Sequence, residues 1–448
     1  MLIKKKNKNN NFFNIINKSI KNKSEYVCVW GAGYIGLSTA CYFAKKGKKV
    51  IAIDNNQNYL NDLKKGRLKN DDFKKWLGIS VKPLIKKQNL IFSGDIAQIR
   101  SKKPLIHFIA IPTEKNGRPF DKILKEVIKK IIKNFDYGLI IIESTLTPGT
   151  SEKILKKYFI SKIKKKKFFY TVAPRRDWFV DNSKNLELMD RVYGGCNDES
   201  GILAKNILSM ICKKLHKAST HKISEMVKSF ENAYRHVDIA LANQLSEAYP
   251  NENIREALKL VGTKWNIGTF YPGFGSGGYC IPLSSRYVVL GSKFKNKLGI
   301  LKETIKTDRD INIKIAKSII RNKFKKIAIL GLSYKEDLKV HILSPVLPLI
   351  KYLKKNKINC QIYDPYYSTN EIKNITKINS FNIKKDLKKF DCIIYHVNHS
   401  FFKKNKKLII KSLRCKYFLD NTGEYLEKAE LFKKMKINYK TTGSSKWI

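Results

Sequence analysis

Short apolar runs alternate with longer, Lys-rich stretches over most of the chain. Runs such as YVCVW (26–30), KVIAID (49–54) and GLIIIES (138–144) predict strands, and the stretches between them have helical spacing. Further strand-like runs occupy residues 89–94, 104–112 and 166–174. Strands that alternate with helices predict a parallel, doubly wound sheet.

The pattern changes in the middle of the chain. From about residue 217 to 262 it is that of an unbroken helix, with apolar residues three and four positions apart. After about residue 312 the alternation returns, with strand-like runs at 325–334, 358–366, 390–398 and 416–423. We therefore expect an α/β protein with two Rossmann-like doubly wound domains joined by a central helical domain. The expected segments are 1–24, 25–216, 217–311 and 312–448.

The charge balance is strongly basic but diffuse. Among 448 residues, 90 are Lys or Arg and 37 are Asp or Glu, which gives a formal net charge of +53. Lys far outnumbers Arg and is spread over all segments, whereas a phosphate-binding patch is local and favours Arg. We therefore expect no specific nucleic-acid partner, although small anionic ligands are attracted from a distance.

The eight cysteines form no C-x-x-C pair and no cluster with metal-ligand spacing. Several lie in apolar strand-like runs, which is typical of a reducing cytoplasm, and no metal site is expected. No apolar run approaches the roughly 18 residues that a membrane helix needs. Residues 1–24 are basic and of low complexity, lack the apolar stretch of a signal peptide, and are expected to form a loose extension.

A glycine motif indicates a dinucleotide site. Gly31, Gly33 and Gly36 form G-x-G-x-x-G directly after a predicted strand and at the start of a predicted helix. Such glycines permit a tight turn and let the backbone approach a pyrophosphate. Asp54 ends the next strand, about 20 residues further on, where a carboxylate binds ribose hydroxyls and repels a 2′-phosphate. The motif therefore predicts NAD rather than NADP. The second alternating block keeps one glycine, Gly331, which indicates a variant nucleotide-binding domain.

Three further residues carry candidate chemistry. Lys228 and Asn232 are four positions apart and project from one face of the predicted helix. Cys280 follows a run with four glycines, which lets a substrate approach the backbone closely. A thiolate attacks an aldehyde carbon, and an ammonium with an amide stabilises the resulting oxyanion. Each residue alone is more often structural, and their combination favours covalent catalysis.

Several runs in fixed order resemble one known family. They are GAGYIGLSTA, IAIPTEKNGRPFD, ESTLTPGT, VKSFENAYRHVDIALANQLSE, GTFYPGFGSGGYCIP, LGLSYKEDLKVHILSP, YDPY and DNTGEY. From about 25 to 445 the chain resembles the UDP-glucose/GDP-mannose dehydrogenases. The resemblance implies that a nucleotide sugar, most simply a UDP-sugar, is oxidised at C6 from alcohol to carboxylate in two NAD-linked steps without release of the aldehyde. It also implies a role in polysaccharide synthesis and a homodimer, or higher homo-oligomer, built on the central segment.

The resemblance also assigns residues. It implies that Cys280 holds a thiohemiacetal and then a thioester, that Lys228 and Asn232 stabilise the oxyanion, and that Thr145 orients water near the nicotinamide. The cofactor-binding positions would be Gly31, Gly33, Tyr34, Ile35, Gly36, Asp54, Thr113 and Glu143. The substrate-binding positions would be Phe270, Tyr271, Gly273, Gly277, Lys335 and Arg175. Residues 25–216 would bind NAD, and residues 312–448 would bind the sugar nucleotide.

Four positions depart from the family pattern. Ser284 stands where most members have a water-activating Asp, and Arg175 replaces the Glu of a Pro-Glu run. Ile342 and Asn266 replace basic residues that contact the cofactor and a neighbouring subunit's substrate. Three alternatives stay open: an enzyme that stops at the aldehyde, a nucleotide-binding relic, and a β-hydroxyacid dehydrogenase. The last would need neither Cys280 nor a second α/β block.

Overall fold

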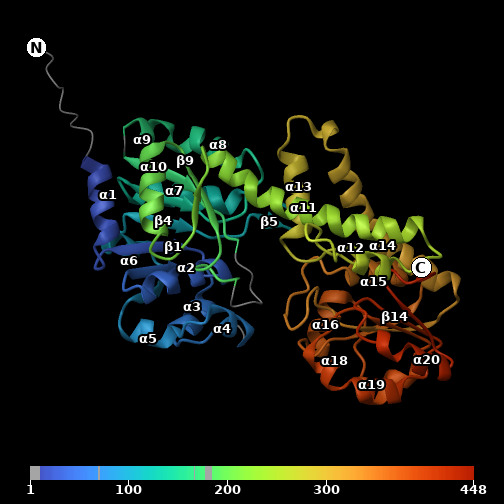
Figure 1. Cartoon of the computed structure of the whole chain (residues 1–448). Coiled ribbons are helices and arrows are strands. Elements are labelled where there is room, and N and C mark those ends of the chain that lie inside the picture. Colours follow the sequence, from blue (N-terminus) through green and yellow to red (C-terminus); the bar gives the residue numbers. More distant parts are fainter. Residues whose placement is uncertain (1–10, 69–70, 166, 177–183) are drawn as a thin grey trace, which may run out of the picture. The chain divides into compact units, whose positions relative to one another are not determined.

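The computed structural model describes residues 11–68, 71–165, 167–176 and 184–448 (Figure 1). The chain forms two compact units. The first ends at Glu231 and also includes Leu290–Lys293, and the second comprises Asn232–Val289 and Phe294–Ile448.

The first unit is built on an eight-stranded sheet with the order β10-β9-β8-β7-β4-β1-β2-β3. Its strands are β1 (Tyr26–Trp30), β2 (Lys49–Ile53), β3 (Leu90–Ser93), β4 (Ile106–Ile109), β7 (Gly138–Ile142), β8 (Phe168–Val172), β9 (Arg191–Gly195) and β10 (Leu215–Lys217). Neighbouring strands are parallel except β8 and β9, which are antiparallel. The predicted doubly wound sheet is confirmed, and the edge formed by β9 and β10 is an addition to it.

Helices cover both faces of this sheet. They are α1 (Asn11–Lys21), α2 (Tyr34–Lys45), α3 (Gln57–Lys64), α4 (Asp71–Leu77), α5 (Val81–Lys86), α6 (Ile96–Ser101), α7 (Lys122–Asn134), α8 (Thr150–Ile154), α9 (Ile160–Lys164) and α10 (Asp198–Leu208), with a π-helical turn at Leu155–Phe159 and a small hairpin of β5 (Glu114–Lys115) and β6 (Arg118–Pro119). Successive side chains of a strand point to opposite faces. Val27 and Val29 of β1 therefore join one core, and Cys28 and Trp30 join the other.

Helix α1 corrects the expectation of a loose N-terminal extension. Residues 11–21 form a helix beside α10 (Figure 1), and Ile16 and Ile20 are 0% and 3% exposed. The Lys48 ammonium donates to the carbonyl oxygens of Ser19 and Asn22 at the end of this helix. Part of the expected extension thus belongs to the first core.

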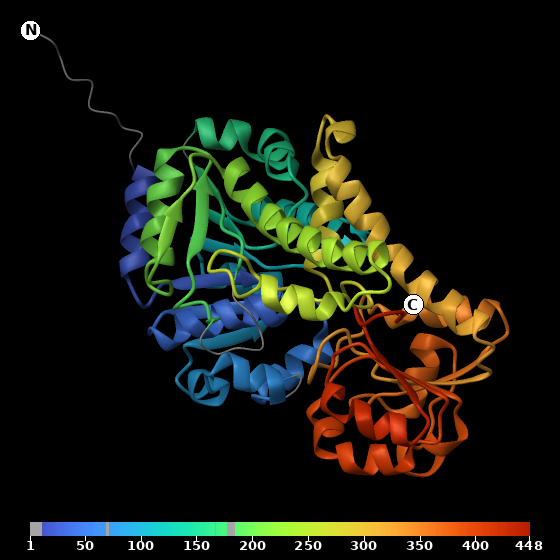
Figure 2. The same cartoon turned by 45° about the vertical axis from the view of Figure 1, so that its right-hand side comes forward.

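The second unit contains a five-stranded, fully parallel sheet with the order β12-β11-β13-β14-β15. Its strands are β11 (Lys326–Leu330), β12 (Asn359–Tyr363), β13 (Cys392–Tyr395), β14 (Tyr417–Asp420) and β15 (Asn438–Thr441). Its helices are α12 (Ile254–Val261), α13 (Ile281–Gly291), α14 (Gly299–Arg321), α15 (Val346–Lys355), α16 (Thr369–Thr376), α17 (Ile383–Asp386), α18 (Ser400–Lys404), α19 (Lys406–Ser412) and α20 (Ala429–Lys434), with 3-10 turns at Lys295–Lys297, Leu387–Lys389 and Leu426–Lys428. In Figure 2 this sheet and its covering helices are coloured orange to red.

The helical middle is less continuous than its pattern predicts. The long helix α11 (His221–Ala248) contains the boundary between the two units, and α12 begins only at Ile254. Pro250 lies in the break, where a helix cannot continue because proline lacks a backbone N–H. The Asn253 side chain then accepts the backbone N–H of Glu256 and starts the new helix.

Candidate active site

The glycine motif forms the turn between β1 and α2, where the strand order of the first sheet reverses. Gly31 has φ +93°, and a Cβ there would lie 2.3 Å from the carbonyl oxygen of Ala110. A Cβ on Gly36 would lie 1.8 Å from the oxygen of Gly31, whereas one on Gly33 would meet nothing within 4 Å. Two glycines thus close the turn, and the third leaves open space at the start of a helix that has no side-chain cap. This is the position at which open α/β sheets bind a pyrophosphate.

Asp54 lies beside this turn, directly after β2. Its Oδ2 accepts the N–H of Ala32 at 3.1 Å, and its Oδ1 accepts the N–H of Asn56 at 3.0 Å. A carboxylate has about four acceptor positions, so both oxygens keep room for hydroxyl donors. The Tyr59 hydroxyl also donates to the oxygen of Ala32 at 3.0 Å, which ties α3 to the turn.

Thr113 and Thr145 follow the neighbouring strands β4 and β7. The Thr113 hydroxyl donates to the backbone oxygen of Thr145, and the Ser144 hydroxyl bonds the backbone of Ile111 at 2.7 and 2.9 Å. The structure therefore brings these two predicted residues together at the same edge of the sheet.

Glu143 and Arg175 belong to one buried cluster beneath α2. The Thr39 hydroxyl donates to Glu143 at 2.6 Å, and Arg191 donates to the other carboxylate oxygen. The Arg175 guanidinium donates to the hydroxyls of Thr39 and Ser38 at 2.6 and 2.7 Å. Arg175 is 5% exposed and Glu143 is 2% exposed. Both residues therefore help to hold α2 in place. These contacts do not support the expected contact of Arg175 with substrate, which stays a prediction.

Lys228 lies in the part of α11 that belongs to the first unit. Its ammonium donates to one oxygen of Glu231 at 3.1 Å, and Arg176 donates to the other oxygen at 2.9 Å. Lys228 is thus held in a cation–carboxylate–cation arrangement, with its side chain 14% exposed.

The same part of α11 is attached to the loop that carries Thr145. The Glu225 carboxylate accepts the backbone N–H groups of Gly149 and Ser151, each at 2.8 Å, and the Ser229 hydroxyl donates to the oxygen of Leu146 at 3.3 Å. Burial raises the pKa of Glu225, and these N–H bonds oppose that rise.

Cys280 lies in the second unit, immediately before α13. It is exposed, whereas Cys196 is half-buried and the other six cysteines of the chain are buried. Ser284, the hydroxyl that replaces the family's Asp, donates its N–H to the oxygen of Cys280 at 3.1 Å, and its Oγ accepts from the Asn232 amide at 3.1 Å. Asn232 therefore reaches the first turn of the helix that follows Cys280.

The glycine-rich loop before Cys280 is held through its backbone. The N–H of Gly273 donates to Asn243 at 2.8 Å, that of Phe274 to Asn421 at 3.0 Å, and that of Gly278 to the oxygen of Ile342 at 2.9 Å. A Cβ on Gly277 would lie 2.4 Å from the Cβ of Tyr334, so this position requires glycine.

The other predicted substrate residues of the second unit are Phe270, Tyr271 and Lys335. The Arg255 guanidinium lies 4.6 Å from the ring centroid of Tyr271, which is 39% exposed, and Phe270 is half-buried. Lys335 follows β11, where burial lowers the pKa of its ammonium. Asn266 is exposed.

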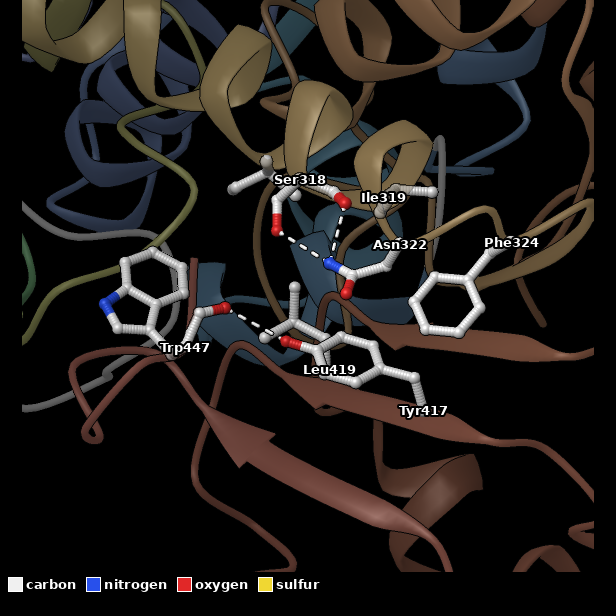
Figure 3. Close-up of a pocket in the computed structure, with 8 residues that line it drawn as sticks. Ser318, Ile319, Asn322, Phe324, Tyr417, Leu419 and Trp447 are labelled. Atoms are coloured by element: carbon white, nitrogen blue, oxygen red, sulfur yellow. Dashed lines mark hydrogen bonds between the residues drawn. The ribbon is translucent and has the colours of Figure 1, made fainter.

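A small pocket between α14 and β14 contains none of the predicted residues (Figure 3). It is lined by Ile315, Ser318, Ile319, Asn322, Phe324, Tyr417, Leu419 and Trp447.

Comparison with known proteins decides the family. Three models of the UDP-glucose/GDP-mannose dehydrogenase family match: the NAD binding domain at residues 25–215, the central domain at 222–314 and the UDP binding domain at 328–423. The chain belongs to this family.

Relatives in the family include sugar dehydrogenases of archaea and bacteria. A UDP-N-acetyl-D-mannosamine dehydrogenase of Methanococcus aeolicus is 31% identical, with 97% of this chain and 99% of that protein covered. A UDP-N-acetyl-D-glucosamine 6-dehydrogenase of Pseudomonas aeruginosa is 26% identical, with 84% and 91% covered. The solved structure of a UDP-D-ManNAc dehydrogenase from Pyrococcus horikoshii shares the fold, with a TM-score of 0.79, 23% identity, and coverage of 94% and 100%.

As a member of this family the chain is an NAD-dependent nucleotide-sugar dehydrogenase, and its glycine turn fits the cofactor. Gly33 leaves the space that a pyrophosphate needs, and Asp54 retains acceptor positions for the adenosine ribose. In the part of the chain that the structure describes, no helix is long and apolar enough to cross a membrane.

Several residues at these sites were not predicted from the sequence. Glu231 lies one turn from Lys228, and His236 one turn from Asn232, so helical spacing was the available signal. Arg191 and Asp308 had no such signal, because each meets its partner only through the tertiary fold.

Proposed function

We propose that this chain oxidises a UDP-N-acetylhexosamine at C6 from alcohol to carboxylate, with Cys280 as the nucleophile. The observation that carries the proposal is the environment of Cys280: it is exposed, follows a glycine loop and precedes α13, whereas six other cysteines are buried. The relatives' names favour a UDP-N-acetylhexosamine, with UDP-N-acetylmannosamine as the first substrate to test.

The proposed chemistry uses the chain's own residues as follows. NAD, when bound, accepts one hydride in each of the two oxidations. The Cys280 thiolate adds to the C6 carbon of the aldehyde, and donors on Lys228 and Asn232 stabilise the oxyanion of the thiohemiacetal. The second oxidation leaves a thioester. Water then attacks its carbonyl carbon, the C–S bond breaks, the carboxylate is released, and the Cys280 thiolate is regenerated.

Hydrolysis of the thioester is expected to be the slow step. A serine hydroxyl cannot accept a proton near neutral pH as a carboxylate can. Ser284 is moreover 1% exposed and bonded to Asn232. We therefore assign the acid–base work of hydrolysis to Lys228.

A cysteine variant and a stoichiometry test the proposal. Cys280→Ser should lose at least about a hundredfold in kcat, because an alkoxide is far harder to form than a thiolate, while NAD binding by fluorescence titration is unchanged. Cys196→Ser, the other partly accessible cysteine, should keep full activity. Two NADH per UDP-sugar supports oxidation to the carboxylate. One NADH indicates release of the aldehyde, and none over a panel of sugar nucleotides contradicts the proposal.

We further propose that the enzyme is a cytoplasmic homodimer, or a higher homo-oligomer, that associates through α11. Tyr234 and Leu241 lie seven positions apart on one face of α11 and are 76% and 50% exposed. Apolar side chains in such a row favour burial by a second copy. Sedimentation of the full chain tests this, and a Tyr234→Lys/Leu241→Lys variant should sediment as a smaller species.

A further inference from the structure

Four polar side chains of the second unit, two of them buried and two half-buried, meet at the glycine-rich loop before Cys280. His236 of α11 lies between Ser285 of α13, Ser276 of the glycine loop and Asp308 of α14. Its Nδ1 is 2.9 Å from the Ser285 Oγ, and its Nε2 is 3.2 Å from the Ser276 Oγ and 3.5 Å from Asp308 Oδ2. The side chains of His236 and Asp308 are 1% and 13% exposed.

The hydrogen positions follow from the donors available. Ser276 donates both its N–H, at 2.6 Å, and its hydroxyl, at 3.0 Å, to Asp308 Oδ1. Since a hydroxyl has one hydrogen, the Ser276 Oγ can then only accept, so Nε2 of His236 carries the proton. On the other side of the ring, Nδ1 bonds the Ser285 hydroxyl at 2.9 Å.

The serine–histidine–aspartate order is that of a hydrolase triad, but its location excludes that chemistry. Ser285 is 0% exposed, so its hydroxyl cannot reach a substrate. The arrangement instead joins α11, α13, α14 and the glycine-rich loop. The loop approaches α14 closely at Gly275, where φ is +98° and a Cβ would lie 2.8 Å from Asp308 Oδ1. Glycine there lets the loop approach the carboxylate closely.

The same network sets the first turn of α13. Asn232 and His236 are one turn apart on α11, and they bond Ser284 and Ser285, which are adjacent on α13. These two parallel links fix the rotation of α13 about its axis. Because Cys280 immediately precedes this turn and accepts the N–H of Ser284, its position depends on them.

We propose that His236, which lies beside Asp308, is a positioning residue. Its Nε2 holds the glycine-rich loop before Cys280, and its Nδ1 holds the first turn of α13. The proposal rests on the proposed function, since it takes the loop as the binding segment for the sugar nucleotide and Cys280 as the nucleophile. It assigns a separate task to each nitrogen of the ring. The Nε2 side holds the loop that is expected to bind the sugar nucleotide. The Nδ1 side holds the turn that carries the nucleophile.

Two amide variants separate these tasks. In His236→Asn the side-chain amide lies where Nδ1 was, so the link to Ser285 is kept and the link to Ser276 and Asp308 is lost. In His236→Gln the amide reaches the position of Nε2, and the opposite link is lost. We expect His236→Asn to raise KM for the UDP-sugar about tenfold with kcat nearly unchanged, and His236→Gln to lower kcat about tenfold with KM nearly unchanged.

A second measurement does not need turnover. The rate at which iodoacetamide alkylates Cys280, followed by peptide mass spectrometry on the full chain, should rise at least about threefold in His236→Gln, since the turn that holds the cysteine is loosened. It should stay at the wild-type value in His236→Asn and in the control His216→Asn, an exposed histidine of the first unit.

The outcomes are distinguishable. An inactive wild type contradicts the proposed function, while the alkylation rates still test the positioning role. Equal changes in kcat, KM and alkylation in the two amide variants would mean that His236 is only a packing residue, and this overturns the proposal. Wild-type behaviour of both variants also overturns it. Melting temperatures of all variants show whether a loss of activity reflects unfolding.

Discussion

At the scale of single residues, Ser284 occupies the position with the largest chemical consequence. Its hydroxyl accepts from the Asn232 amide at 3.1 Å and is buried against the first turn of α13. A carboxylate at this position would accept the same amide N–H and would also take a proton from water. The serine side chain therefore accepts the hydrogen bond that an aspartate would accept, but it supplies no general base.

Restoring the carboxylate should speed up release of product. Ser284→Asp is expected to raise the rate of thioester hydrolysis about tenfold or more, since a positioned general base contributes at least that much. The measurement is the fraction of Cys280 that carries the acyl group, found by mass spectrometry after acid quench during turnover. This fraction should fall in Ser284→Asp and stay high in Ser284→Asn, which has the same shape without the charge. Equal fractions in the two variants would contradict the prediction.

At the scale of elements, helix α1 shows how much a short amphipathic segment contributes. Ile16 and Ile20 are buried, and Phe12 and Phe13 pack against the same core, although Lys and Asn fill most neighbouring positions. Apolar residues three and four positions apart are sufficient to attach a helix to a sheet domain. This spacing was not recognised in the sequence because residues 1–24 are basic and of low complexity.

Truncation of a buried side chain in α1 should destabilise the first unit. Ile16→Ala removes three buried carbon atoms and is expected to lower the free energy of unfolding by about 2–4 kcal/mol. Urea denaturation followed by circular dichroism measures the change. The matched control Asn14→Ala, at an exposed position of the same helix, should change stability by less than about 0.5 kcal/mol. A small effect at Ile16 would mean that α1 is not attached in solution.

At the scale of the whole molecule, each of the two units has a buried histidine in, or directly after, a strand of its sheet. In the first unit His107 of β4 accepts the Trp30 indole N–H at 3.3 Å, and burial lowers its pKa from 6.5 to about 3. In the second unit His396 follows β13, and burial lowers its pKa to about 4. In the unfolded chain both rings take up protons near their ordinary pKa. Between pH 6.5 and these lower values the unfolded state therefore binds more protons, and stability falls as the pH falls.

The acid limb of the stability curve tests this coupling. Wild-type stability should decrease from pH 6.5 downward, each histidine contributing up to about 1.4 kcal/mol per pH unit. His107→Leu leaves the Trp30 N–H without its partner, so it should be less stable at pH 7, but its decrease between pH 6 and 4.5 should be shallower than that of the wild type. Urea denaturation at several pH values gives both slopes, and equal slopes would contradict the assignment.

Strand positions and the cofactor turn were predictable because their signals are local. Apolar runs of four to six residues define β1, β2 and β7, and the glycines of the turn need only the strand before them and the helix after them. The break at Pro250 was missed although it too is a local signal, since the helical periodicity continues on both sides of it.

Side-chain partners from distant segments were not predictable. The contact of Arg175 with substrate stays a prediction, whereas the bonds of its guanidinium with Ser38 and Thr39 on α2 had no signal in the sequence. His236 and Asp308 are separated by 72 positions and meet at 3.5 Å. No periodicity links such pairs, since their distance depends on how helices and loops pack.

The sequence by itself therefore determined the two doubly wound domains, the NAD-binding turn with Asp54, and the choice of Cys280, Lys228 and Asn232 as candidate catalytic residues. Only the tertiary structure decided what surrounds them: the Glu231 carboxylate between Lys228 and Arg176, the buried cluster around Glu143, and the His236 network behind the cysteine loop. The physical reason is the distance along the chain over which each interaction acts. Backbone preference and hydrophobic period act over a few residues, whereas a buried polar side chain takes whichever partner the packed core brings within about 3 Å.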